Sequence, residues 1–159
     1  MNKISLLKFI AKAHKNTYAA PQEVKLRNKC KTPILDGHID YDFSEGDWRY
    51  HDSYCGVQWA PGREVVFLQG KPLWSMSYQG QTIDGLSSEF VDETFGFLKK
   101  ALMNVDQKKP FRGPAQFVEG EYEYRFEMKG DYSYFVGRES IKHKGKEVFF
   151  QDVMGTLIK

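Results

Sequence analysis

The sequence repeats one ordered pattern of glycines and charged residues. Residues 45–83 share eleven positions with residues 119–158, at an offset of 74 that becomes 75 after one inserted residue. The matched pairs are Glu45/Glu119, Gly46/Gly120, Tyr50/Tyr124, Gly56/Gly130, Gly62/Gly137, Arg63/Arg138, Glu64/Glu139, Gly70/Gly145, Lys71/Lys146, Gly80/Gly155 and Ile83/Ile158. Because most of these residues suit turns, the repeat predicts one supersecondary unit that is built twice.

Each copy of the repeat has the composition of a β-meander. Aromatic and β-branched residues are grouped between glycine-containing turns, which is typical of short antiparallel strands. We expect strands at 37–43, 48–52, 54–60, 63–69 and 72–78, and a second meander from Gly120 to the end. The apolar run 65–68 predicts a strand buried on both faces. Residues 24–31 alternate between apolar and basic side chains, which predicts an edge strand protected by lysines.

Two segments have the 3.6-residue periodicity of amphipathic helices. The first covers 3–17, with Asn2 or Ser5 as its N-cap, and the second covers about 88–105, with Ser87 or Ser88 as its N-cap. Because residues 97–101 resemble residues 9–13, one helix belongs to each copy. We therefore predict a single α+β domain, 1–159, made of two tandem units at about 1–86 and 87–159. The two meanders form one curved antiparallel sheet, and both helices pack on one face.

Charge and cysteine content narrow the classes of partner. The 23 basic and 21 acidic residues give a net charge of +2, which provides no general attraction to nucleic acid or to an anionic membrane. Lys8 and Lys12 interrupt the apolar start, so we expect no signal peptide, and no segment reaches transmembrane length. Cys30 and Cys55 lack CxxC spacing, and we interpret them as free thiols of a cytoplasmic protein.

Glu64 and Glu139 are the most suggestive candidates for catalysis. They occupy the same position in each copy, and two carboxylates that converge at a two-fold axis can act as acid and base in a small hydrolase or isomerase. The alternative is that Gly-Arg-Glu marks a β-turn or bulge with a solvated Arg–Glu pair. His51 and Asp52 are adjacent in a strand, so we expect them to point to opposite faces.

The sequence lacks the familiar motifs of metal and nucleotide sites. His14, His38, His51 and His143 have neither HxH nor HxxxH spacing, so we predict no metal and no other cofactor. There is no GxSxG, no GxxxxGK[ST] and no GxGxxG after a strand.

The predicted sheet carries more aromatic rings than two short helices can cover. A remaining concave aromatic face would suit a small apolar or amphipathic ligand, or alternatively a partner peptide. The candidate ligand-binding residues are Trp48, Tyr50, Asp52, Tyr54, Glu64, Trp74, Tyr78, Arg112 and Glu139. A protein-interaction module, for example a homodimer formed through an edge strand, is the remaining class.

The order of several segments resembles an uncharacterised prokaryotic domain family whose members occur alone or behind a Cro-like helix-turn-helix. The resemblance covers nearly the whole chain and is carried by residues 50–54, 62–64, 72–80, 97–98, 111–114 and 137–139. It implies an effector-sensing module and assigns no catalytic residue. Our leading hypothesis is a non-enzymatic bacterial domain that binds or senses a small ligand.

Overall fold

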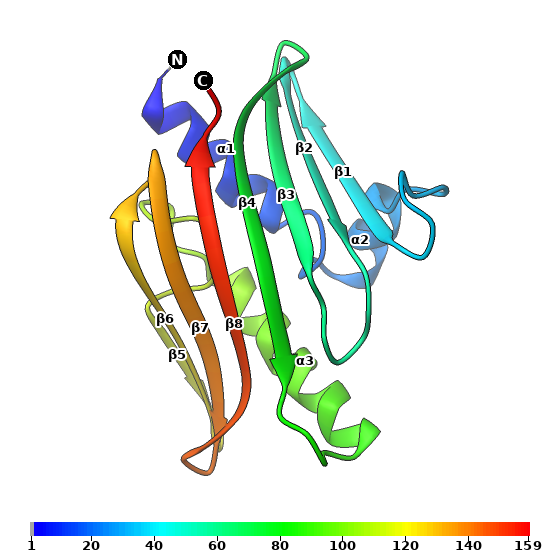
Figure 1. Ribbon diagram of the computed structural model, residues 1–159, viewed down its shortest axis with the longest axis vertical. Coiled ribbons are helices and arrows are strands. Elements are labelled where there is room, and N and C mark those ends of the chain that lie inside the picture. The colour runs from blue at the N-terminus through cyan, green and yellow to red at the C-terminus, as the bar shows by residue number, and fades with distance from the viewer. Residues whose placement is uncertain (1) are drawn as a thin grey trace.

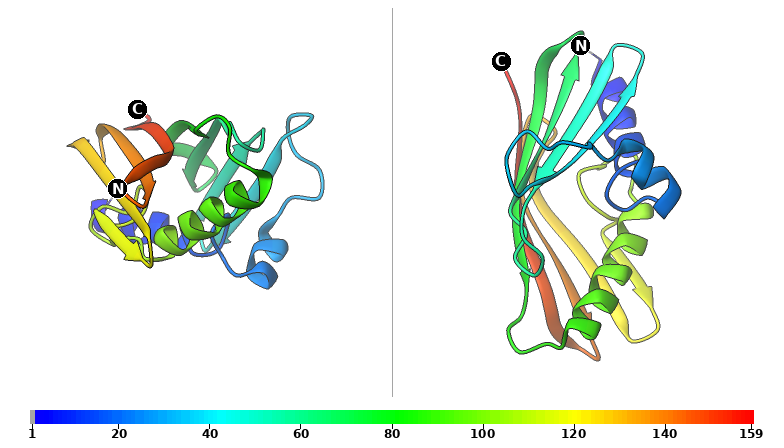
Figure 2. Two further views of the ribbon diagram at one scale, coloured as in Figure 1. Left: turned by 90° about the horizontal axis from the view of Figure 1, so that it is seen from below. Right: turned by 90° about the vertical axis from the view of Figure 1, so that its right-hand side faces the viewer.

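A computed structural model describes residues 2–159 and contains one eight-stranded antiparallel sheet with its helices on one face (Figure 1). The elements are α1 (Lys3–His14), α2 (Gln22–Asn28), β1 (Ile39–Glu45), β2 (Trp48–Tyr54), β3 (Gly62–Leu68), β4 (Lys71–Thr82), α3 (Ser88–Met103), β5 (Gln116–Glu119), β6 (Tyr122–Asp131), β7 (Tyr134–His143) and β8 (Lys146–Leu157). The strand order is β1-β2-β3-β4-β8-β7-β6-β5, and the sheet is curved and open (Figure 2). The predicted fold class is confirmed.

The sheet consists of two four-stranded meanders that join where β4 pairs with β8. Each meander has its own helix, α1 or α3, and the helix makes matching contacts in each half. Phe9 stacks on Phe43 and Trp48, while Phe97 packs on Phe117 and Tyr122; Lys12 pairs with Glu45, and Lys100 pairs with Glu119. An internal duplication would produce these parallels, and the duplication itself stays a prediction.

The two main helices begin at the predicted caps and fill the core with one face. The Asn2 side chain accepts a hydrogen bond from the Ile4 amide, and Ser87 accepts one from the Phe90 amide. Their buried faces carry Leu6, Leu7, Phe9, Ile10 and Ala13 from α1 and Val91, Phe97, Leu98, Ala101 and Leu102 from α3. In the part of the chain that the structure describes, no helix is long and apolar enough to cross a bilayer.

The predicted edge strand at 24–31 is wrong, because this segment forms the short helix α2. Pro21 stands at its N-cap position, and Glu23 forms an i,i+4 ion pair with Arg27 that suits a helix. None of the α2 side chains is buried, so the alternation of apolar and basic residues did not reflect a sheet face. Only Lys29, after the helix, makes a single bridge to Tyr41 of β1.

The strands around residues 52–68 also differ from the prediction. β2 continues through Asp52 to Tyr54, and the expected strand at 54–60 is instead a loop with one isolated bridge, Trp59 to Gln81. Gly56 has a φ of +85° in this loop, and a Cβ there would collide with the Trp59 carbonyl. The run 65–68 in β3 is buried on one face only, because the helices cover one side of the sheet (Figure 2).

Candidate functional site

A cavity of about 450 Å³ lies between the helix-facing side of the sheet and helices α1 and α3. Aromatic side chains form much of its wall: Tyr18, Tyr50, Tyr54, Tyr78, Phe95 and Phe149. Six polar side chains line it too, and each is at least nine-tenths buried: His14, Thr17, Asp52, Glu64, Arg112 and Gln151. Buried polar groups in an aromatic pocket are typical of a site that orients a small molecule.

Asp52 and Glu64 are the centre of the polar group. The register of β2 against β3 places them directly opposite one another, so both side chains extend from the same face of the sheet. Burial, followed by the charge of Glu64, raises the pKa of the Asp52 carboxyl to about 7, against the lowering effects of Tyr78, Arg112 and His14. The Tyr78 hydroxyl donates a 2.7 Å hydrogen bond to Oδ1 of Asp52.

Two carboxylate oxygens at this centre lack a hydrogen-bond partner within residues 2–159. Glu64 Oε2 lies 2.9 Å from His14 Nε2, but Glu64 Oε1 has only Arg112, at 3.8 Å. Asp52 uses Oδ1 for Tyr78, and its Oδ2 has no such bond. Because both residues line the cavity, these oxygens are available to hydrogen-bond donors on a ligand.

Glu139, the counterpart of Glu64 in the sequence repeat, has a fully occupied carboxylate. Its Oε1 accepts from Arg112 at 2.6 Å and from Gln151 at 2.8 Å, and its Oε2 accepts from the Tyr124 hydroxyl at 2.7 Å. Burial by itself would lower the pKa of the Arg112 guanidinium. The charge of Glu139 and its hydrogen bonds to Arg112 outweigh this effect of burial, so the pKa is raised. Arg112 therefore remains a cation and links both glutamates.

The segment between α3 and β5 holds Arg112 in this position. Phe111 is buried and stacks on Phe135, with ring centroids 4.4 Å apart. The Gly113 amide donates to the Tyr124 hydroxyl at 3.0 Å, and a Cβ at Gly113 would lie 2.7 Å from the Tyr124 ring. An apolar anchor before Arg112 and a close backbone approach after it direct the guanidinium into the interior.

Gly62 makes room for Tyr78, and we expect Gly62→Ala to displace that ring. A Cβ at Gly62 would lie 2.3 Å from the Tyr78 ring, and overpacking of this kind costs about 1–3 kcal/mol. Urea unfolding and loss of the perturbed tyrosine signal in near-ultraviolet circular dichroism measure the effect. Gly96→Ala is the matched control, since open space surrounds that helical glycine and alanine should stabilise by roughly 0.5–1 kcal/mol. Equal stability of both variants would contradict this role.

The structure brings together six of the nine sequence-predicted ligand-binding residues. Tyr50, Asp52, Tyr54, Glu64, Tyr78 and Arg112 line the cavity. Glu139 does not line it but holds Arg112. Trp48 packs against Phe9, and Trp74 is fully buried against both Phe111 and Phe135, with its indole N–H donating to the Tyr132 carbonyl. These two tryptophans belong to the core.

Sequence reasoning missed His14, Tyr18 and Gln151. His14 had a usable signal: it follows Leu7 and Ile10 at helical spacing, so a polar side chain continues the buried face of α1. Tyr18 lies after the end of α1, outside its helical pattern. Gln151 can be recognised as a site residue only from the register of β7 and β8, which places it opposite Glu139. No local pattern marked either residue.

A model of a domain of unknown function, DUF5680, matches residues 52–158. The chain belongs to this family. The match contains Asp52, Glu64, Tyr78, Arg112 and Glu139, but it begins after His14 and Tyr50. No curated protein and no solved structure matches the chain. Family membership therefore assigns no activity to the chain.

Proposed function

We propose that this domain binds a small amphipathic molecule that carries a protonated amine, and that it does so without chemical turnover. The observation that carries the proposal is an excess of buried carboxyl groups. Asp52, Glu64 and Glu139 share the interior with Arg112 and His14, so the acids outnumber the cationic groups even when His14 is protonated. A buried charge without a partner is costly, and Asp52 reduces that cost by keeping its proton up to a pKa of about 7. A ligand cation would supply the partner that lets Asp52 ionise.

The two carboxylate oxygens without a hydrogen-bond partner support the same kind of ligand. Asp52 Oδ2 and Glu64 Oε1 offer acceptors to a group with several N–H donors, whereas Arg112 already donates to Glu139. On α3, the more exposed Asp92 and Lys99 that line the cavity balance one another in charge. An anionic ligand would face the carboxyl pair, and the buried cation beside that pair, Arg112, already donates to Glu139.

The aromatic wall supports an apolar body for the ligand. Tyrosine faces attract cations and cover alkyl or aryl groups, and the volume of about 450 Å³ lies in the range of small-molecule sites. Tyr18 and Tyr54 pack edge to face with ring centroids 5.8 Å apart, so part of the wall is already ordered. Ordered walls reduce the entropy cost of binding.

Calorimetric titration with matched compounds tests the proposal. The probes are alkyl and aryl amines, 2-phenylethylamine among them, each compared with its alcohol and its carboxylic acid. We expect the amine to bind about 10- to 100-fold more tightly than the alcohol, since a hydrogen bond to a charged group contributes about 1.5–3 kcal/mol. The acid should bind most weakly because it faces Asp52 and Glu64.

Glu64→Gln separates the proposed contact from general hydrophobic binding. The variant should lose the preference for amine over alcohol while it keeps the affinity for the alcohol. Glu89→Gln is the control, because Glu89 is exposed on α3 and should leave both affinities unchanged. Tighter binding of acids than of amines, or no binding by any member of the series, would count against the proposal.

A second candidate function is proton transfer in a small hydrolase or isomerase. The specific observation is the buried contact of 2.9 Å between Glu64 Oε2 and His14 Nε2 beside the cavity. Glu64 would be the base and His14 the group that orients it. Glu139 is a poorer candidate than the sequence indicated, since its oxygens are occupied. Mass spectrometry of the amines and of their amide and ester derivatives after incubation distinguishes turnover from binding.

We propose that the domain senses its ligand in the cytoplasm of a prokaryotic cell. The resemblance to modules that follow a Cro-like helix-turn-helix supports this role. A homodimer through the short edge strand β5 (Gln116–Glu119) is the structural alternative, because β5 has only β6 as a neighbour. Sedimentation with and without a bound amine would show whether ligand binding and association are linked.

A further inference from the structure

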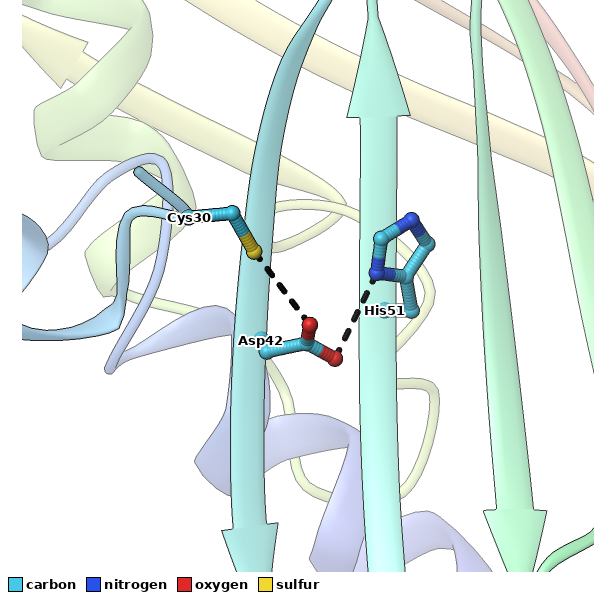
Figure 3. Close-up of side chains that lie close together, drawn as sticks. All are labelled: Cys30, Asp42 and His51. Carbon is cyan, nitrogen blue, oxygen red and sulfur yellow. Dashed lines mark hydrogen bonds and ion pairs between the residues drawn. The ribbon is translucent and has the colours of Figure 1, made fainter. Parts of the chain in front are cut away.

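A second group of chemistry-bearing side chains lies on the face of the sheet opposite the cavity. Asp42 of β1 and His51 of β2 are directly paired, and Cys30 follows α2 beside them (Figure 3). The Cys30 sulfur lies 3.2 Å from Asp42 Oδ2, and His51 Nδ1 lies 3.3 Å from Asp42 Oδ1. One ligand atom from each residue lies within 4.8 Å of the other two.

The backbone fixes these three residues independently of their side chains. Asp42 and His51 are held by the antiparallel ladder of β1 and β2. The bridge between Lys29 and Tyr41 and the 2.8 Å hydrogen bond from the Cys30 amide to the Asp40 carbonyl hold Cys30 against β1. The cluster is therefore built before any ligand arrives.

His51 carries a buried nitrogen that the described protein leaves without a hydrogen bond. The residue is 8% exposed, and its Nδ1 is directed at Asp42 within ion-pair distance but outside hydrogen-bond geometry (Figure 3). Its other nitrogen, Nε2, lies 3.5 Å from the Asp40 carboxylate, which the Ile34 amide holds in place. A carboxylate behind one nitrogen and no hydrogen bond on the other is the arrangement of a metal-binding histidine, whose free nitrogen gives up its proton when the metal binds.

The spacing of the donor atoms fits a tetrahedral ion. Zinc binds sulfur at about 2.3 Å and nitrogen or carboxylate oxygen at about 2.0–2.1 Å, so neighbouring ligands around it lie roughly 3.3–3.6 Å apart. The observed contacts of 3.2 and 3.3 Å are close to these edges, but they end on different oxygens of Asp42. Small side-chain rotations would therefore bring one carboxylate oxygen, the sulfur and the nitrogen, which lie within 4.8 Å of one another, onto a single ion. A mixed set of sulfur, nitrogen and oxygen suits zinc better than magnesium or calcium, which take oxygen ligands.

We propose that Cys30, Asp42 and His51 form a zinc site with three protein ligands and a fourth position open to solvent. The sequence had predicted no metal, because the three ligands come from separate segments without a recognisable spacing. The site is independent of the amine cavity: Asp52 faces the cavity, whereas the adjacent His51 extends from the other side of β2.

Arg49 sets the affinity of this site. Its Nε donates to Asp42 Oδ1 at 2.7 Å and its Nη2 donates to Oδ2 at 3.3 Å, and its charge opposes the approach of a cation. The side chain is about half exposed, so it can move aside or remain on one oxygen of Asp42. In the metal-free protein, burial and then the hydrogen bond to Asp42 raise the pKa of the Cys30 thiol to about 11, so binding must also displace a proton.

Titration of the full chain with Co²⁺, followed by competition with Zn²⁺, tests the proposal. We expect one Co²⁺ per chain with a thiolate-to-cobalt charge-transfer band in the near ultraviolet. Cys30→Ser should abolish the band, and Cys55→Ser, the matched control, should retain it. Asp40→Asn should weaken binding about 10- to 100-fold through the orientation of His51. Arg49→Gln should strengthen binding.

The outcomes that overturn the proposal are equally specific. They are no thiolate band in the wild-type protein at millimolar Co²⁺, a band that survives in Cys30→Ser, or a band that disappears in Cys55→Ser. Far-ultraviolet circular dichroism of each variant shows that the sheet is retained. An Arg49→Gln variant that binds Zn²⁺ more weakly than the wild type would also refute the assignment, because removal of a competing cation can only help a metal.

Discussion

Replacing Arg112 with methionine is expected to destabilise the protein by about 3–5 kcal/mol, the usual cost of removing one partner from a buried ion pair. Arg112 is the cation that contacts both Glu139 and Glu64 in the interior. Without it, the Glu139 carboxylate keeps only Tyr124 and Gln151 as donors. Urea unfolding at pH 7 measures the loss.

Arg138→Met is the matched control for this experiment. Arg138 pairs with Asp152 on the opposite, exposed face of the sheet, where ion pairs contribute about 0–1 kcal/mol. The double variant Arg112→Met with Glu139→Gln should recover part of the stability that Arg112→Met loses. Equal effects of Arg112→Met and Arg138→Met would show that the buried network does not hold the two halves together.

Asp52→Asn is expected to stabilise the protein at pH 8 and to have little effect near pH 4. The Asp52 carboxyl has a pKa of about 7 in the folded state, against about 3.8 as its ordinary value. The folded state therefore binds more protons than the unfolded state between about pH 4 and pH 7, so stability falls as the pH rises through this window. Three pKa units correspond to at most about 4 kcal/mol.

The measurement is the midpoint of urea unfolding across pH 4–8 for the wild type and for Asp52→Asn. The wild-type curve should fall relative to that of the variant as the pH rises, since asparagine has no carboxyl to ionise. Asp152→Asn, a change at an exposed acid, should follow the wild type. Parallel curves for the wild type and Asp52→Asn would mean that Asp52 ionises in the folded protein as it does in water.

The sequence predicted the architecture better than the individual elements. Glycines and charges at turns indicated two meanders, and the helical periods indicated α1 and α3 with their caps at Asn2 and Ser87. The errors fall on short segments. At 24–31, eight residues fit both a strand and one exposed helix, and only the Glu23–Arg27 pair favoured the helix. At 54–60, aromatic content concealed a loop around Gly56.

The candidate site was harder to predict because it depends on register. The sequence paired Glu64 with Glu139, since the repeat placed them in equivalent positions. The structure instead places Glu64 opposite Asp52 and puts Arg112 between the two glutamates. The end of β2 and the turn that follows it set the register of β2 against β3. The predicted end at residue 52 was two residues short, because β2 continues to Tyr54.

The register also limits how many molecules one chain can hold. Glu64 lies between Asp52 and Met76, whereas Glu139 lies between Phe126 and Gln151, and Tyr78 faces Val153 across the central strand pair. One half of the sheet thus presents the carboxyl of Asp52 and the hydroxyl of Tyr78 where the other presents the phenyl ring of Phe126 and the isopropyl group of Val153. A ligand titration should therefore saturate at a stoichiometry of one, despite the near two-fold symmetry of the strand order.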